Sequence, residues 1–313
     1  MRKSSLKFRF LLKLTPTPNS RYPIAMQNPA ISKREFLKLS ATALATAAFA
    51  GVPNALSAAQ AAKKKIPVGL QLYSVRNECQ KDLVGTITQV SKIGYKGVEF
   101  AGYYGRDAKT LRQILDDANL KCCGTHTALD TLLGDNLAKT IEFNQTLGNQ
   151  FLIVPGLGGK YTSSREAWKK TAELFNELAD KVKPHKMRVG YHNHTTEFKP
   201  LDGELPWDTF FGGTKKEVVM QFDTGNAMIG GGDATVFLKK YPGRATTVHI
   251  KPFSKAKPNA LLGEDELPWP DIFKLCETSA RTQWYIVEYE SDAFPPLISV
   301  EKCFNVLRQW GKC

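Results

Sequence analysis

The sequence has few cysteines, and none of them is spaced as a zinc-binding pair. The 313 residues contain six cysteines and no Cys-x-x-Cys motif, so a structural zinc site of the zinc-finger kind is not expected. One or two disulfides could form in an oxidising compartment, but the spacing does not pair them. Buried free thiols are the expectation for the adjacent Cys122 and Cys123.

The amino-terminal part is almost without acidic residues. Residues 1–65 contain 12 Lys and Arg against the single Glu35, so they supply +11 of the formal net charge of +13. The rest of the chain carries only +2. That charge provides no clustered basic surface of the kind that binds a nucleic-acid backbone. We therefore expect no nucleic-acid partner.

Long hydrophobic runs are also missing. The apolar segment Leu39–Val52 is too short to span a bilayer as a permanent helix. It follows the basic Lys33-Arg34 and Lys38 and precedes an Ala-x-Ala site at Ala59–Ala61, which is the order of an export signal peptide. We expect an exported protein without a stable membrane span once the signal is removed.

Residues 32–38 resemble the twin-arginine export box, with Lys33 in the place of the first arginine. We expect residues 1–61 to be a leader, in which Met26 is the more natural start, and residues 62–313 to be the mature protein. A periplasmic location follows from this prediction. A disordered tail or a membrane anchor is the alternative interpretation of the leader.

From residue 66 onward, short apolar runs alternate with stretches of helical periodicity, as expected for βα units around a parallel sheet. The predicted strands are Val68–Leu72, Gly97–Phe100, Lys121–Thr125, Phe151–Val154, Arg188–His192, Val218–Asp223, Ala245–Ile250 and Trp284–Tyr289. The predicted helices are Leu83–Ile93, Ala108–Asn119, Asn136–Leu147, Ser164–Lys183, Leu205–Phe211, Ala234–Tyr241, Trp269–Ala280 and Pro296–Trp310. Eight units of about 31 residues predict a single (β/α)₈ TIM barrel.

A doubly wound open sheet is the alternative fold. Such a sheet usually has a Gly-rich turn after its first strand, whereas this first strand continues into Gln71-Leu72-Tyr73. The isolated Gly230-Gly231-Gly232 is more simply a flexible loop or a helix entry than a phosphate cradle. No linker interrupts residues 66–313, so we expect one domain.

Polar residues able to bind a metal recur at the ends of the predicted strands, where the βα loops of a barrel form the active site. From His192 to Asp223, His249 and Glu288 the intervals are 31, 26 and 39 residues, or one βα unit each. Adjacent strands should therefore direct these side chains to one point. Taken singly, a strand-end Asp often caps a helix and a lone His is often structural, but the set predicts a metal site.

The carboxylates of Asp223 and Glu288 with the imidazole of His249 suit a divalent ion such as Mn²⁺, Mg²⁺, Co²⁺ or Zn²⁺. His192 and His194 point the same way on an extended strand, so either could be the fourth ligand, with His192 favoured.

Four motifs resemble the xylose-isomerase-like barrel superfamily of sugar phosphate isomerases and epimerases, over about residues 66–311. They are Gln221-Phe222-Asp223-Thr224-Gly225-Asn226, Val248-His249-Ile250-Lys251, Gly263-Glu264 followed by Trp269, and Ile286-Val287-Glu288-Tyr289.

The resemblance implies metal ligation by the end of the fifth strand and by Asp223, His249 and Glu288. The family's usual fifth-strand ligand is Glu, and His192 stands there in this chain. An imidazole in place of a carboxylate makes the site less negative by one charge, which favours Zn²⁺ or Co²⁺.

The chemistry of this superfamily begins with removal of a proton beside a carbonyl. Glu288 or His194 would be the base, and Lys251 would place a cation near the enediolate unless it is a solvated loop lysine. Glu264 would be a second acid/base or would bind a hydroxyl. The expected substrate-binding residues are Gln71, Tyr73, Glu99, His126 and Asn226, although barrel-top packing would equally explain several of them.

The expected function is a metal-dependent isomerase or epimerase of an unphosphorylated sugar. The alternative is a keto-sugar lyase or dehydratase that uses the same enolate, for example in 3-keto-glycoside elimination. More remote alternatives are an abasic-site endonuclease and a non-catalytic sugar-binding barrel. For every alternative except the endonuclease, the expected partner is a small sugar. The sequence is also compatible with an oligomer.

Overall fold

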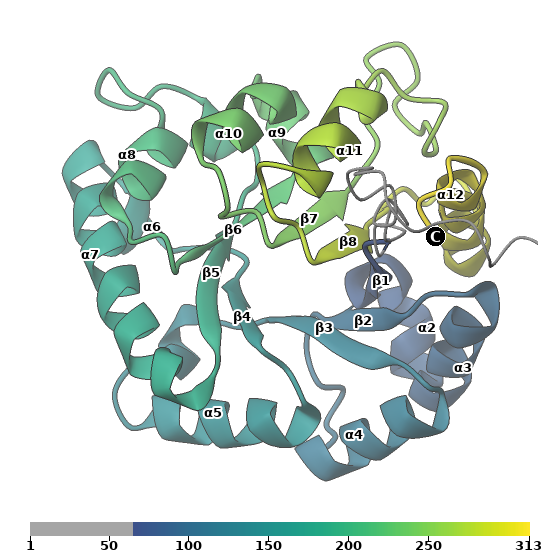
Figure 1. Ribbon diagram of the computed structural model, residues 1–313. Coiled ribbons are helices and arrows are strands. Elements are labelled where there is room, and N and C mark those ends of the chain that lie inside the picture. The colour runs from purple at the N-terminus through teal and green to yellow at the C-terminus, as the bar shows by residue number, and fades with distance from the viewer. Residues whose placement is uncertain (1–64) are drawn as a thin grey trace, which may run out of the picture. The chain divides into compact units, whose positions relative to one another are not determined.

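The computed structural model describes residues 65–313, which form a closed barrel of eight parallel strands (Figure 1). The strands are β1 (Val68–Gln71), β2 (Gly97–Phe100), β3 (Lys121–His126), β4 (Phe151–Val154), β5 (Arg188–His192), β6 (Val219–Asp223), β7 (Thr247–Ile250) and β8 (Trp284–Val287). Each strand pairs with the next in sequence, and β8 pairs with β1 to close the barrel. The prediction of a single (β/α)₈ barrel is confirmed.

The helices surround the barrel (Figure 1). They are α2 (Arg76–Lys81), α3 (Leu83–Ile93), α4 (Ala108–Asp117), α5 (Asn136–Leu147), α6 (Gly159–Thr162), α7 (Arg165–Val182), α8 (Pro206–Gly213), α9 (Thr224–Gly230), α10 (Ala234–Lys240), α11 (Trp269–Glu277) and α12 (Pro296–Gln309). Short 3₁₀ turns are η1 (Leu72–Val75), η2 (Leu129–Leu132), η3 (Lys183–His185) and η4 (Thr196–Phe198). None of the helices among residues 65–313 is both long and apolar enough to cross a membrane.

The helix α7 shows how the sequence specifies this outer layer. Ser164 caps its first turn by accepting a hydrogen bond from the backbone N–H of Ala167. Trp168, Phe175 and Val182 recur at helical spacing and are buried against the sheet. The charged side chains between them face outward, which fixes the side of the helix that packs on the barrel.

The barrel interior is filled at its amino-terminal end by side chains of alternate strands. Phe151, Ile153 and Val219 form a small buried cluster with Trp284, and these residues come from β4, β6 and β8. Gly97 makes room for the Trp284 ring, because a Cβ there would come within 3.0 Å of it. The interior is therefore a packed core, and polar chemistry is confined to the carboxyl ends of the strands.

All six cysteines lie among the described residues and are free thiols, and five of them are buried. The expectation for Cys122 and Cys123 is confirmed. The predicted export signal, its twin-arginine box and the boundary at residues 61 and 62 lie outside the described residues and stay predictions.

Candidate metal centre

The structure brings together the side chains that the sequence places at four consecutive strand ends. His192 ends β5, Asp223 ends β6, His249 lies one residue before the end of β7, and Glu288 follows β8 directly. One potential ligand atom from each of the four lies within 4.8 Å of the others, and all four side chains are buried. His194, the alternative fourth ligand, is only partly covered by its neighbours and does not belong to this group.

Histidine is concentrated at this end of the barrel. The chain has five histidines, and four of them, His126, His192, His194 and His249, lie in a chain of ring contacts with centroid separations of 4.6 to 5.5 Å. His185, in η3, is exposed and remote from these contacts.

His249 connects the two carboxylate groups of the centre. Its Nδ1 lies 2.8 Å from Oε2 of Glu288 and 3.7 Å from Oδ2 of Asp223. Its Nε2 lies 2.6 Å from Oε2 of Glu99, on the other side of the ring. The Nδ1 side of the imidazole therefore faces the candidate ligands, and the Nε2 side faces a supporting carboxylate.

Asp223 provides the observation that tests whether a metal fits. Its Oδ1 accepts a 2.6 Å hydrogen bond from the backbone N–H of Asn226 and caps α9. Its Oδ2 is buried and has no hydrogen-bond partner, although an unpaired buried carboxylate oxygen is costly. A divalent cation held by two carboxylates and two imidazoles would satisfy Oδ2, so the residues present fit such an ion.

Burial and neighbouring charges perturb the ionisation of the whole cluster. Burial raises the pKa of Asp223 to about 7. Burial alone would lower the pKa of His249, but the carboxylates of Glu99 and Glu288 outweigh it and raise that pKa to about 10. Burial holds the pKa of His192 well below its usual range, with His249 adding to the effect. His192 is therefore a neutral imidazole, whereas the His249 ring carries the positive charge that a metal would otherwise provide.

Glu288 stays ionised in this environment. Burial opposes ionisation, but Lys251 and His249 outweigh it and hold the pKa of the Glu288 carboxyl well below its usual range. Lys251 is largely buried, with its Nζ 2.9 Å from Oε1 of Glu290 and 3.9 Å from Oε2 of Glu288. An ammonium group thus borders the centre.

Glu99 and Gln71 lie deeper than expected for residues that bind substrate hydroxyls. Both side chains are fully buried, and Nε2 of Gln71 donates to Oε2 of Glu99 at 2.8 Å. His126 stacks on His249 and keeps about 10% of its side chain exposed. The structure therefore places Glu99 and Gln71 as supports of the centre and leaves His126 at its edge.

The remaining predicted residues differ in exposure, since Asn226 is buried whereas Tyr73 and Glu264 are exposed. Tyr73 is 42% exposed and its ring lies under the guanidinium group of Arg76. Asn226 donates from its side-chain amide to the carbonyl of Asn193. Glu264 binds Lys257 in the loop before α11, and no hydrogen bond or ion pair between described residues links Glu264 to the centre.

Two residues that hold the centre were not assigned a role from the sequence. Gln221 precedes Asp223 by two positions and so shares its side of β6, which is the signal that could have revealed it. Its amide lies between Glu99 and His192. Asn193 pairs with the Asp223 backbone through two hydrogen bonds of 2.8 and 3.0 Å, and nothing local in the sequence indicates that role.

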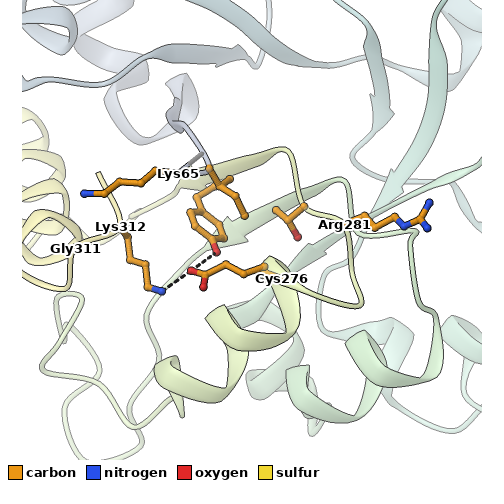
Figure 2. Close-up of a pocket in the computed structure, with 9 residues that line it drawn as sticks. Lys65, Cys276, Arg281, Gly311 and Lys312 are labelled. Carbon is orange, nitrogen blue, oxygen red and sulfur yellow. Dashed lines mark hydrogen bonds and ion pairs between the residues drawn. The ribbon is translucent and has the colours of Figure 1, made fainter. Parts of the chain in front are cut away.

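Two hollows in the described part of the chain differ in their relation to the centre. One of about 500 Å³ adjoins His194 and is lined by Trp168, Tyr191 and Glu197 among others. Figure 2 shows the other, of about 430 Å³, lined by Lys65, Cys276, Arg281, Gly311 and Lys312. It lies where β1 and β8 begin. Residues at that end of a barrel usually contribute to stability rather than to catalysis. The first hollow adjoins His194, whose ring contacts that of His192, whereas the second is lined by no residue of the centre.

Comparison with known proteins agrees with the fold. The xylose isomerase-like TIM barrel family matches residues 87–310. An inosose dehydratase from Clostridium perfringens is 25% identical over 244 residues, which cover 66% of this chain and 82% of that protein. A sugar phosphate isomerase/epimerase from Parabacteroides distasonis has a solved structure with a TM-score of 0.68 and 24% identity, covering 77% of this chain and 97% of the other.

A probable 3-DHS dehydratase from Bacillus anthracis also shares the fold, with a TM-score of 0.60 and 14% identity over 77% of this chain and 98% of the other. The prediction of an enzyme of the isomerase, epimerase or lyase type is confirmed by the similarity to the inosose dehydratase. The family match spans most of the described barrel, and the chain belongs to the xylose isomerase-like TIM barrel family.

Proposed function

We propose that the chain is a divalent-metal-dependent lyase that dehydrates a polyhydroxylated ketone, such as a keto-cyclitol or keto-sugar, through an enolate. The observation that carries the proposal is the buried group of His192, Asp223, His249 and Glu288 with its unpartnered Asp223 Oδ2. The similarity to inosose dehydratases supports the lyase class over the isomerase or epimerase class that the sequence favours first. A bound divalent ion would polarise the ketone and stabilise the enolate charge as a Lewis acid.

The residues around the centre can supply the proton transfers. Partial burial lowers the pKa of His194, so its ring is neutral and can accept the hydrogen on the carbon beside the ketone as a proton. The electrons of that C–H bond form the enolate double bond. The β carbon–oxygen bond breaks as the enolate collapses, and the departing hydroxide takes a proton to leave as water.

Lys251 is the group best placed to stabilise the developing oxyanion or to protonate the departing hydroxyl. Burial would lower its pKa, but Asp223 and Glu288 outweigh burial and raise it above its usual range. The side chain therefore carries a full positive charge beside Glu288. A preorganised cation at a buried site contributes strongly to stabilising a transition-state charge.

The test is a turnover assay with inosose after chelation and reloading with Mn²⁺ or Zn²⁺. We expect formation of an unsaturated ketone, followed by its ultraviolet absorbance and by chromatography, only in the metal-loaded protein. His249→Gln should abolish the reaction, whereas the exposed control His185→Gln should retain it. Metal-loaded wild-type protein that exchanges no substrate hydrogen with D₂O and forms no product would overturn the proposed chemistry.

A metal-dependent isomerase or epimerase of an unphosphorylated sugar is the second candidate. Two separate proton carriers, His194 and the Lys251–Glu288 pair, border the centre, as inversion of a carbon would require. Incubation of the metal-loaded protein with a ketohexose distinguishes the candidates. A C3 epimer without loss of water would favour the epimerase and contradict the lyase.

We also propose that the protein is exported through the twin-arginine route. The support is the sequence of residues 32–61 described above. Expression of the full chain in hosts with and without a functional twin-arginine translocase should give periplasmic protein only in the first. Periplasmic protein in both hosts would contradict the route, and cytoplasmic protein in both would contradict export.

A further inference from the structure

The carboxylate of Glu99 is surrounded by hydrogen-bond donors. Its Oε1 lies 2.7 Å from Nε2 of Gln221, and its Oε2 lies 2.8 Å from Nε2 of Gln71 and 2.6 Å from Nε2 of His249. The side chain is fully buried. The Gln71 amide is oriented independently of Glu99, because its Oε1 accepts a 3.0 Å hydrogen bond from the backbone N–H of Tyr73 and its NH₂ group therefore faces Glu99. A carboxylate only accepts hydrogen bonds, so each of these neighbours must donate.

This requirement fixes the orientation of the Gln221 amide. Its NH₂ group faces Oε1 of Glu99 and also Oγ1 of Thr247, at 3.1 Å. Its Oε1 then faces Nδ1 of His192 at 3.0 Å and Nε2 of His126 at 2.9 Å. The reverse orientation would bring two oxygens together in a fully buried site and leave the carboxylate without a donor.

Each histidine tautomer follows from its partner. The amide oxygen of Gln221 can only accept, so Nδ1 of His192 carries the hydrogen and Nε2 of that ring has the lone pair. The carboxylate of Glu99 likewise requires a hydrogen on Nε2 of His249, so Nδ1 is the nitrogen from which the charged ring loses its proton when a metal binds. The opposite nitrogen, Nδ1, faces Glu288 and Asp223 and is the one able to bind a metal.

We infer that Glu99 is a positioning residue that sets the tautomers of both imidazole ligands, acting on His249 directly and on His192 through the Gln221 amide. The metal would bind Nδ1 of one ring and Nε2 of the other. The inference rests on the proposed function, because the tautomers matter only when a metal binds. The His192 tautomer itself is a property of the protein with or without metal. A single carboxylate from β2 thus prepares ligands on β5 and β7.

The effect matters because the wrong tautomer places an N–H group where the metal needs a lone pair. Partners of this kind also fix the ring orientation and raise the basicity of the ligand. Their loss typically weakens metal binding by about 10- to 100-fold. The relay would therefore contribute to metal affinity without any contact between Glu99 and the ion.

The experiment uses the full chain with ¹⁵N-labelled histidine. Side-chain nitrogen spectra report the hydrogen on each ring nitrogen, before and after Zn²⁺ is added, and calorimetry gives the Zn²⁺ affinity. The variants are Glu99→Gln, which removes the charge, and Gln221→Met, which breaks only the relay. Thr247→Val is the matched control, because it removes another hydrogen bond of the same amide and leaves Glu99 untouched.

In the wild type we expect His192 to carry its hydrogen on Nδ1, and Zn²⁺ to shift its Nε2 and the Nδ1 of His249. Glu99→Gln should give both His192 tautomers and an affinity loss of about 10- to 100-fold. Gln221→Met should give both His192 tautomers while His249 keeps its Nε2 hydrogen. Thr247→Val should change neither ring.

A wild-type His192 with its hydrogen on Nε2 would overturn the inference, as would an unchanged His192 tautomer in both Glu99→Gln and Gln221→Met. Circular dichroism verifies folding, and Gln221→Met decides the question if Glu99→Gln does not fold. Wild-type protein that binds no metal would refute the proposed function instead. The tautomer of its His192 would still confirm or overturn the relay.

Discussion

Replacing Asp223 with asparagine should make the metal-free protein more stable while removing its response to metal. Burial raises the pKa of Asp223 from its ordinary value of 3.8 to about 7. A shift of about three units corresponds to roughly 4 kcal/mol of destabilisation above pH 7, at 1.36 kcal/mol per unit. Asparagine is neutral and its oxygen can still cap α9 through the Asn226 backbone N–H, so the variant should recover part of that free energy.

The sign of the pH dependence follows from proton binding. The folded protein holds the Asp223 proton more tightly than the unfolded chain, so wild-type stability falls as the pH rises from about 4 to about 7. The advantage of Asp223→Asn should therefore be absent near pH 4, grow through that range and be complete near pH 8.

The assay is urea denaturation in EDTA, followed by circular dichroism from pH 4 to pH 8.5, then repeated with Mn²⁺ or Zn²⁺. Metal should stabilise the wild type, by about 2.7 kcal/mol at a free concentration 100 times the Kd, and should leave Asp223→Asn unchanged. Asp292→Asn, in an exposed loop position, is the control. A variant that is less stable than the wild type at pH 8 in EDTA would refute this reasoning.

Further predictions concern the metal, the cation and the loop. Because the pKa of His249 is raised to about 10, metal binding should release a proton, and the Kd for the metal should rise about tenfold for each unit by which the pH is lowered between pH 8.5 and 7.5. Calorimetry in buffers of different ionisation enthalpy measures the released proton. A pH-independent Kd would contradict this prediction. Lys251→Met should lower kcat about 100-fold, with partial recovery in Lys251→Arg; equal activity of both variants and the wild type would exclude a catalytic role. Glu264→Gln should leave kcat/KM unchanged in steady-state assays, because Glu264 binds Lys257 in its own loop. A large loss of kcat/KM would instead show that Glu264 acts in the active site.

The fold could be predicted because each strand is a short apolar run and each major helix has a clear apolar stripe. The predicted helices Leu83–Ile93 and Asn136–Leu147 match α3 and α5 residue for residue. The helix α9 was not predicted, since Thr224–Gly230 contains two glycines, which disfavour helix in isolation. Capping by Asp223 and packing on β7 stabilise it in the folded protein.

The first strand also ends one residue earlier than predicted. Leu72 begins the 3₁₀ turn η1 because the side chain of Gln71 accepts a hydrogen bond from the backbone N–H of Tyr73. The apolar pattern of the sequence at this point predicts a longer strand. A side-chain hydrogen bond to the backbone therefore decided a boundary that hydrophobic periodicity alone did not.

The choice of His192 over His194 was open in the sequence, since both positions share a side of an extended strand. In the structure the strand ends at His192, and the chain turns where the backbone N–H of His194 donates to the buried Glu197. His192 consequently stays inside the barrel, and His194 reaches the rim beside the hollow.

The sequence by itself determined the barrel, the approximate positions of its strands and the candidate ligands, because these depend on local runs and on the spacing of one βα unit. The tertiary structure alone decided which oxygen of Asp223 lacks a partner and how Glu99 acts. Glu99 contacts Gln221 and His249, which are 122 and 150 residues away in the chain. Hydrogen-bond partners so distant, and the pKa shifts that follow from their shared burial, arise only when closure of the barrel removes these groups from water.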